Sequence, residues 1–165
     1  MGEFVEWMGS DLTGLARVPS ADISVMENAE ILARIMGSGR AAARALGVGE
    51  STFRGWRKGV QPRKGAGPIV QMARAAAVNR NRAHFQNVMD GTDVVAIRGT
   101  VVVSGDTRDR TIHPGRDIPL VKIRNIVRAW LAGQDDRVDR LMMKAIDEHY
   151  VPGLQIGDVT GVWFE

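Results

Sequence analysis

Residues 39–58 read GRAAARALGVGESTFRGWRK and decide the fold of the first half of the chain. A helix-turn-helix needs a small residue where its two helices approach most closely, a glycine or similar residue in the turn, and apolar residues at fixed offsets. Ala43 is the small residue here, and Gly47 is the turn glycine. The apolar offsets are filled by Ala42, Leu46, Val48, Phe53 and Trp56. The stretch therefore predicts a helix-turn-helix with Phe53 and Trp56 in its core.

The positive charge of the chain is concentrated around this motif. The 165 residues carry 22 basic and 19 acidic side chains, for a net charge of +3. Residues 34–82 hold eleven of the bases and one acid, whereas residues 1–33 and 83–165 are both net acidic. A basic surface attracts a polyanion, because neutralised phosphates release their counterions. We expect double-stranded DNA as the partner, and the alternative is a basic face that only contacts solvent.

The second helix of the motif is expected to enter the major groove, where its outward side chains reach the bases. We predict that Ser51 and Arg54 contact base edges. Glu50 either accepts a hydrogen bond from a cytosine or, as we favour, stabilises the helix start. The phosphate contacts are expected from basic residues that flank the insertion. The full predicted DNA-binding set is Arg40, Arg44, Glu50, Ser51, Thr52, Arg54, Arg57, Lys58, Arg63 and Lys64. The competing interpretation is a helix pair that packs internally and touches no DNA.

The rest of the chain divides into three predicted segments. Residues 1–23 are expected to form a short helix or a loosely docked arm, residues 24–90 a helix-turn-helix domain, and residues 91–165 a β-α-α-β module for self-association or partner contact. The fold class is therefore α+β. Helices are expected over 24–36, 38–46, 50–58, 69–89, 120–131 and 138–149, with N-caps at Ser24 and Ser38. Strands are expected over 94–103 and 155–164, and they are expected to pair with each other. A bend is expected at Gly99 and a turn at 105–106.

Composition excludes several classes of function. The absence of cysteine excludes disulfide scaffolds, thiolate zinc sites and cysteine nucleophiles. No apolar run approaches the roughly 18 residues needed to span a bilayer, and the chain starts with acidic residues where a signal peptide would be basic. The three histidines His84, His113 and His149 lack metal-ligand spacing. We expect no enzyme activity, cofactor, metal or membrane contact, and a cytoplasmic, nucleoid-associated location.

The order of elements resembles the telomeric terminal proteins of linear actinobacterial replicons of the Streptomyces type. Three stretches carry the resemblance: AAARALGVGESTFRGWRKG at 41–59, VVAIRGTVVV followed by SGDTRDRTI at 94–112, and IDEHYVPGLQIGDVTGVWFE at 146–165. The first stretch is a generic helix-turn-helix. The resemblance implies binding to telomeric DNA, covalent attachment to the 5′ end through a side-chain hydroxyl that primes synthesis, and a telomere-associated protein and a DNA polymerase as partners.

The same resemblance implies a region for the priming hydroxyl. By position after the first strand it is Thr107, with Thr111 and Ser104 in reserve. The alternative interpretation of residues 104–111 is a polar loop between strand and helix. Our leading prediction is a sequence-specific DNA-binding protein for replicon maintenance or transcriptional regulation, which acts as a homodimer. A priming terminal protein is the alternative, and a structural assembly protein that has repurposed the helix pair is the third reading.

Overall fold

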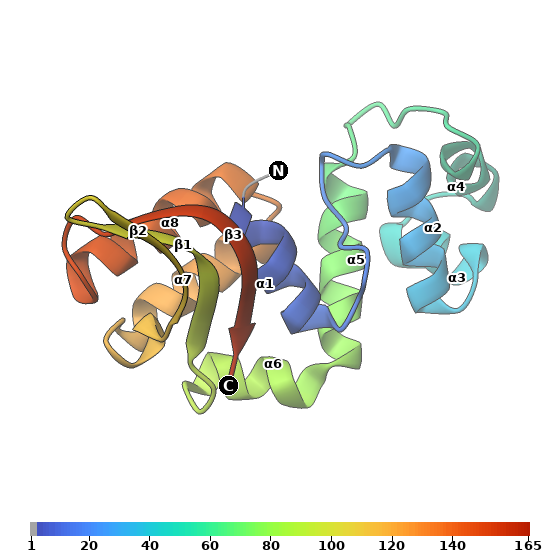
Figure 1. Cartoon of the computed structure of the whole chain (residues 1–165). Coiled ribbons are helices and arrows are strands. Elements are labelled where there is room, and N and C mark those ends of the chain that lie inside the picture. Colours follow the sequence, from blue (N-terminus) through green and yellow to red (C-terminus); the bar gives the residue numbers. More distant parts are fainter. Residues whose placement is uncertain (1–2) are drawn as a thin grey trace.

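Two hydrophobic cores organise the chain, which has the expected α+β fold. The computed structural model describes residues 3–165. The first core belongs to the helix-turn-helix segment and lies at one end of the elongated molecule (Figure 1). Its helices are α2 (Val25–Met36), α3 (Gly39–Leu46), α4 (Glu50–Arg57) and the first half of α5 (Gly67–Arg80). Its buried residues are Val25, Ala29, Leu32, Ala33, Ala42, Ala43, Phe53, Ile69 and Ala73.

The predicted caps fix the ends of these helices. Ser24 forms a capping box with Glu27: its hydroxyl accepts from the Glu27 amide at 3.1 Å, and the Glu27 carboxylate accepts from the Ser24 amide at 3.3 Å. The hydroxyl of Ser38 caps α3 by accepting from the amide of Ala41 at 3.0 Å. Gly47 ends α3 with φ +68°, a left-handed conformation that favours glycine. The two predicted N-caps and the turn glycine are thus confirmed.

The second core lies beneath a three-stranded antiparallel sheet with strand order β2-β1-β3. The strands are β1 (Val95–Val103), β2 (Asp106–Ile112) and β3 (Gln155–Phe164). The predicted pairing of the first and last strands is confirmed, and its register shifts on both sides of Gly99. A Cβ at Gly99 would lie 2.8 Å from the carbonyl oxygen of Asp158. Glycine therefore permits the close approach of β3 at the predicted bend.

The predicted αα-hairpin packs against this sheet. It consists of α7 (Leu120–Leu131) and α8 (Asp135–His149), which contribute buried residues such as Trp130 and Met142 to the core. Lys122 on α7 donates to Glu148 on α8 at 2.6 Å, and this hydrogen bond lowers the pKa of the Glu148 carboxyl. A short 3₁₀ turn, Pro114–Arg116, leads from β2 into α7.

Strand β2 corrects the predicted β-α-α-β order. Residues 104–111 were expected to form a turn and a polar loop, but β2 pairs with β1 in a hairpin, so the order of the module is β-β-α-α-β. Only Ile112 of the seven residues of β2 is buried. A strand with no alternation of apolar and polar residues gives no periodic signal, which is why the sequence did not reveal it.

The beginning of the chain also differs from a loosely docked arm. Residues Glu3–Thr13 form α1, which lies along the sheet beside β3 (Figure 1). Its apolar face is buried in the second core through Phe4, Val5, Met8 and Leu12. Gly9 leaves room for Val18 and Trp130, because a Cβ at this position would lie 2.7 Å from Cγ1 of Val18 and 3.0 Å from the Trp130 ring. The short helix was the correct alternative, and residues 1–2 of the expected arm lie outside the described residues.

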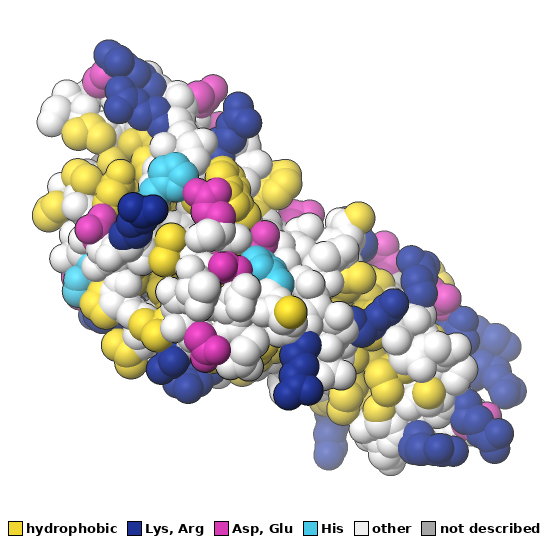
Figure 2. Space-filling model, turned by 90° about the horizontal axis from the view of Figure 1, so that it is seen from below, with side chains coloured by type: hydrophobic (Ala, Val, Ile, Leu, Met, Phe, Trp, Pro, Cys, Tyr) yellow, Lys and Arg dark blue, Asp and Glu magenta, His cyan; other side chains and the backbone are white. Residues whose placement is uncertain are grey.

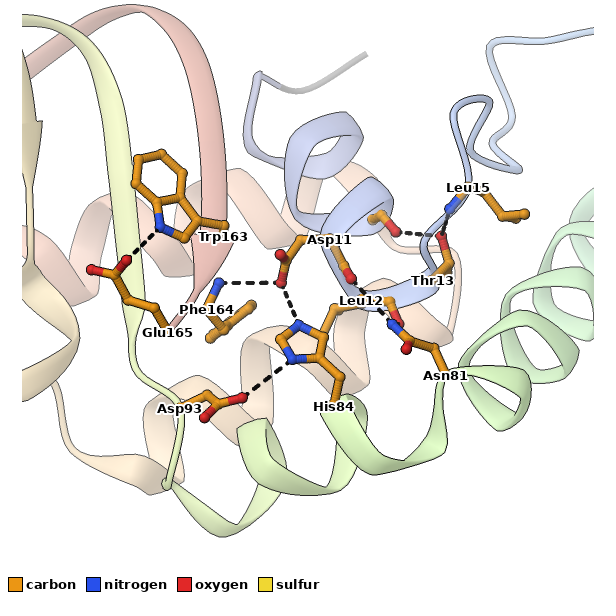
Figure 3. Close-up of polar contacts among 11 residues, drawn as sticks. Asp11, Leu12, Thr13, Leu15, Asn81, His84, Asp93, Trp163, Phe164 and Glu165 are labelled. Carbon is orange, nitrogen blue, oxygen red and sulfur yellow. Dashed lines mark hydrogen bonds and ion pairs between the residues drawn. The ribbon is translucent and has the colours of Figure 1, made fainter.

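A polar cluster fixes α1 to the end of β3 and to α6 (Arg82–Asp90) (Figure 3). The Asp11 carboxylate accepts from the backbone amide of Phe164 at 3.1 Å and lies 2.7 Å from Nε2 of His84. The other ring nitrogen of His84 lies 3.2 Å from the Asp93 carboxylate. Asn81 donates to the carbonyl oxygen of Leu12 at 3.1 Å. Asp11 therefore links α1 both to α6, through His84, and to the end of β3, through Phe164.

Helix α5 belongs to both cores. The predicted helix over 69–89 is two helices, because Asn81 leaves the helical conformation between α5 and α6. Ile69 and Ala73 of α5 pack in the first core, whereas Val78 packs in the second. The view in Figure 1 accordingly places α5 between the two halves of the molecule.

The side chain of Arg74 on α5 is completely buried between the two cores. Its guanidinium makes a bidentate ion pair with Asp135, at 2.7 and 3.1 Å, and lies 4.7 Å from the centre of the Trp130 ring. It also donates to the carbonyl oxygens of Pro19 at 2.8 Å and Trp130 at 2.6 Å. A buried guanidinium is stable only with such partners, so Arg74 fixes α5 to α7 and α8.

Among the described residues, no helix combines the length and apolarity that crossing a bilayer requires.

We predict that Asp135→Ala destabilises the protein by about 3–5 kcal/mol, because it leaves the buried charge of Arg74 without its carboxylate. Urea unfolding followed by circular dichroism measures this change. Asp136→Ala is the matched control: Asp136 is exposed in the same helical turn, so its loss should cost less than about 1 kcal/mol. Equal losses for the two variants would contradict the anchoring role of Arg74.

Candidate nucleic-acid interface

The helix-turn-helix is formed by α3 and α4, joined through Gly47, Val48 and Gly49. The amide of Val48 donates to the carbonyl oxygen of Ala43 at 3.0 Å, which closes the turn. Phe53 points from α4 into the first core, where its side chain is buried. Trp56, one helical turn later, is half-buried and meets the Phe53 ring edge-on, with 6.0 Å between the ring centres. The predicted core positions of both aromatic residues are confirmed, so the opposite side of α4 faces outward.

The outward side of α4 is exposed along its whole length. Ser51, Thr52 and Arg54 are exposed, and so is Lys58 directly after the helix. The helix lies at the end of the molecule away from the sheet (Figure 1), and the described elements that contact it, α2 and α3, pack against its inner side. Figure 2 shows Lys and Arg side chains gathered at the end that α3 and α4 occupy. A cationic helix face of this kind has the reach and the charge to enter the major groove.

Two of the predicted phosphate-binding arginines are paired with acids of the same domain. Arg57 on α4 forms an ion pair with Glu30 on α2 at 2.8 Å. Arg40 on α3 pairs with Glu50 on α4 at the same distance. Glu50 stands in the first turn of α4, as the helix-stabilising interpretation expects, and its carboxylate pairs with Arg40. These two pairs brace α4 against the neighbouring helices.

The other predicted cations are available to a ligand. Arg44, Arg54 and Lys58 are exposed and have no acidic partner within residues 3–165. The same holds for Arg63 and Lys64 in the loop between α4 and α5. The positive charge that the sequence concentrates in residues 34–82 is therefore only partly neutralised around α4. Arg74, in the same stretch, is buried with Asp135 and cannot contact a partner.

The three hydroxyl groups suggested for priming lie away from α4, on the β1–β2 hairpin at the other end of the molecule (Figure 1). Ser104 occupies the hairpin turn with φ +51°, a conformation that is unusual for serine. Thr107 stands opposite Val102, and Thr111 stands opposite Arg98. All three residues are exposed. The structure thus separates the helix-turn-helix from the candidate hydroxyls instead of bringing them together.

Sequence reasoning missed two residues that shape the interface. Glu30 orients Arg57, and nothing in the spacing of α2 distinguishes this glutamate from an ordinary solvent-exposed one. Gly39, at the start of α3, leaves room for Arg57: a Cβ there would lie 3.0 Å from the guanidinium nitrogen Nη1. The glycine is visible in the sequence, but the contact that needs it depends on the packing of α4.

Comparison of the chain with protein-family models, with curated proteins and with solved structures found no match. The resemblance to telomeric terminal proteins therefore stays a prediction, and the case for the interface depends on the geometry and charge described above.

We predict that Phe53→Ala lowers the free energy of unfolding by about 3–5 kcal/mol, because it removes a buried ring that packs α4 against the first core. Ser51→Ala, two residues away on the exposed side, should change it by less than about 0.5 kcal/mol. Urea unfolding of both variants measures the difference. A comparable loss in Ser51→Ala would show that the outward side of α4 is part of the core.

Proposed function

We propose that the chain binds double-stranded DNA sequence-specifically, with α4 in the major groove. The observation that carries the proposal is the exposed face of α4, where Ser51, Thr52 and Arg54 stand at one end of the molecule without partners among residues 3–165. Arg54 suits the bidentate recognition of a guanine, and the short hydroxyl side chains suit base edges or nearby phosphates. The buried Phe53 holds this face in place from behind.

The surrounding cations supply the electrostatic part of binding. Arg44, Lys58, Arg63 and Lys64 flank α4 in sequence and are exposed and unpaired in the described part of the chain. Such side chains fix the protein on the phosphate backbone without reading sequence. Arg40 and Arg57 contribute positive charge, but each already neutralises a carboxylate, so they add less to binding. Replicon maintenance and gene regulation are the roles that this mode of binding serves.

A single helix of eight residues reads few base pairs, so we propose that two copies bind adjacent half-sites. The module of residues 91–165 is the part of the chain available for self-association, because it lies away from α4. The second half-site is then bound as an intramolecular event, which raises the affinity without new contacts. Sedimentation of the protein with and without its selected duplex measures the number of copies.

The proposal predicts different effects for Arg54→Ala and Arg63→Ala. A duplex selected from random oligonucleotides provides the target for both titrations. Arg54→Ala should cost about 1–3 kcal/mol of binding and relax the preference at one base pair, because a bidentate base contact is lost. Arg63→Ala should weaken binding to all duplexes alike and reduce the salt dependence, because a phosphate contact is lost.

Arg80→Ala is the matched control for charge. Arg80 is exposed at the end of α5 and lies outside the predicted set, so its loss should change the affinity for the selected duplex less than either variant above. Equal losses from Arg54→Ala and Arg63→Ala on every duplex would contradict readout by α4. An unchanged affinity in both would contradict binding through this end of the molecule.

Priming of replication from a hydroxyl is the second candidate function, and exposure of the hairpin favours it. Thr107 projects from an edge strand with no partner for its hydroxyl among the described residues, so a polymerase could reach it. The metal ions for such chemistry would belong to the polymerase. Mass spectrometry of the protein purified from its host provides the test. A nucleotide adduct on Thr107, Thr111 or Ser104 supports priming, and unmodified residues 104–111 in DNA-bound protein exclude it.

A further inference from the structure

A cavity of about 650 Å³ lies directly beside the helix-turn-helix. Ile69 of the first core and Thr52 of the predicted DNA-binding set belong to its lining. The turn between α3 and α4 forms one wall, with Val48, and Trp56 of α4 forms another. The loop that leads into α5 closes it with Val60 and Pro62. The volume falls within the range of about 300–1,000 Å³ that is typical of small-molecule sites.

The lining is mostly apolar, and its charged side chains are the cations Arg63 and Lys64. The half-buried Trp56 ring and the exposed Val60 offer apolar surface that no other described residue covers. Arg63 and Lys64 stand in the same lining, and both lack an acidic partner in residues 3–165. No aspartate or glutamate belongs to the lining. A neutral apolar molecule would satisfy the walls and leave both cations unpaired, whereas an inorganic anion would leave the walls in water.

We propose that this cavity binds a small amphipathic monoanion, an aromatic or branched aliphatic carboxylate. Its apolar part packs against Trp56 and Val60, and its carboxylate pairs with Arg63 or Lys64. The cations are exposed, so each pair contributes modestly, and the apolar contact supplies the rest of the affinity.

The position of the cavity couples it to DNA, and this part of the inference depends on the proposed function. Arg63 and Lys64 cannot pair fully with a bound carboxylate and with a DNA phosphate at the same time. The anion therefore weakens DNA binding, and by thermodynamic reciprocity the duplex weakens binding of the anion to the same extent. The cavity is thus an effector site of a DNA-binding protein.

The site is tested on the full chain in the absence of DNA. Benzoate and its neutral isostere benzamide are titrated separately at constant ionic strength, and the amide and indole N–H signals are followed by NMR. We expect saturable shifts at the Trp56 indole and at Val48 and Gln61, with benzoate binding about two- to fivefold more tightly than benzamide. An absence of saturable shifts at these residues, or equal affinity for the two compounds, would overturn the proposal.

A charge-matched pair of variants isolates the two cations. The double variant Arg63→Gln/Lys64→Gln should lose the preference for benzoate and keep the weak binding of benzamide. The double variant Arg80→Gln/Arg82→Gln removes the same charge from exposed positions outside the cavity and should leave the preference unchanged. The changes are on the surface, so both proteins should fold. An unchanged preference in the first variant, or its loss in the second, would refute the site.

Titration of the selected duplex with and without saturating benzoate separates the two proposals. A lower DNA affinity in benzoate, absent in Arg63→Gln/Lys64→Gln, supports the coupling. Unchanged DNA affinity in benzoate refutes the coupling. If benzoate binds as expected but no duplex binds, the proposed function fails and the anion site stands.

Discussion

The buried guanidinium of Arg74 is the interaction on which the arrangement of the molecule depends. It brings a permanent positive charge into the space between two cores, where burial is costly unless each of its nitrogens has a partner. Asp135, together with the carbonyl oxygens of Pro19 and Trp130, meets this requirement from separate segments of the chain. The pairing fixes the two cores relative to each other, because movement of any one of these segments would leave the buried charge without one of its partners.

This fixed arrangement explains how the proposed interface is presented. Helix α5 runs through both cores, so the helix-turn-helix is held at one end of the molecule and the β1–β2 hairpin at the other (Figure 1). Glu30 on α2 and Glu50 on α4 each pair with an arginine of the helix-turn-helix, and the two pairs link α4 to α2 and α3. The remaining cations are free to meet a phosphate backbone or, in the cavity beside Trp56, a small carboxylate.

Local signals in the sequence were sufficient for most of the fold. Ser24, Ser38 and Gly47 have side-chain and backbone requirements that act within a few residues, so the helix boundaries could be predicted. The β-branched residues of β1 and the residues of the closing strand β3 likewise predicted these two strands. Strand β2 could not be found because its side chains face solvent, and its pairing comes from β1 alone. The apolar residues of α1 have helical spacing, but the core that buries them is formed by residues far along the chain.

The candidate site was predictable in outline and less so in detail. The spacing around Gly47 identified α4 and separated its buried from its exposed face. The ion pair of Arg57 with Glu30 and the burial of Arg74 could not be predicted, because each partner is brought close only by tertiary packing. Counting charges along the chain therefore overestimates the cations available to a partner. The cavity beside Trp56 could not be predicted for the same reason, since its walls come from three separate segments.

A residue-by-residue NMR map of the full chain, recorded as a duplex selected from random oligonucleotides is added, shows directly whether DNA binds along α4. We expect the largest changes on the amides of residues 50–58 and in the loop at 60–65, with little change in the sheet. Changes concentrated on the β1–β2 hairpin or on α7 and α8, with α4 unaffected, would rule out binding through α4.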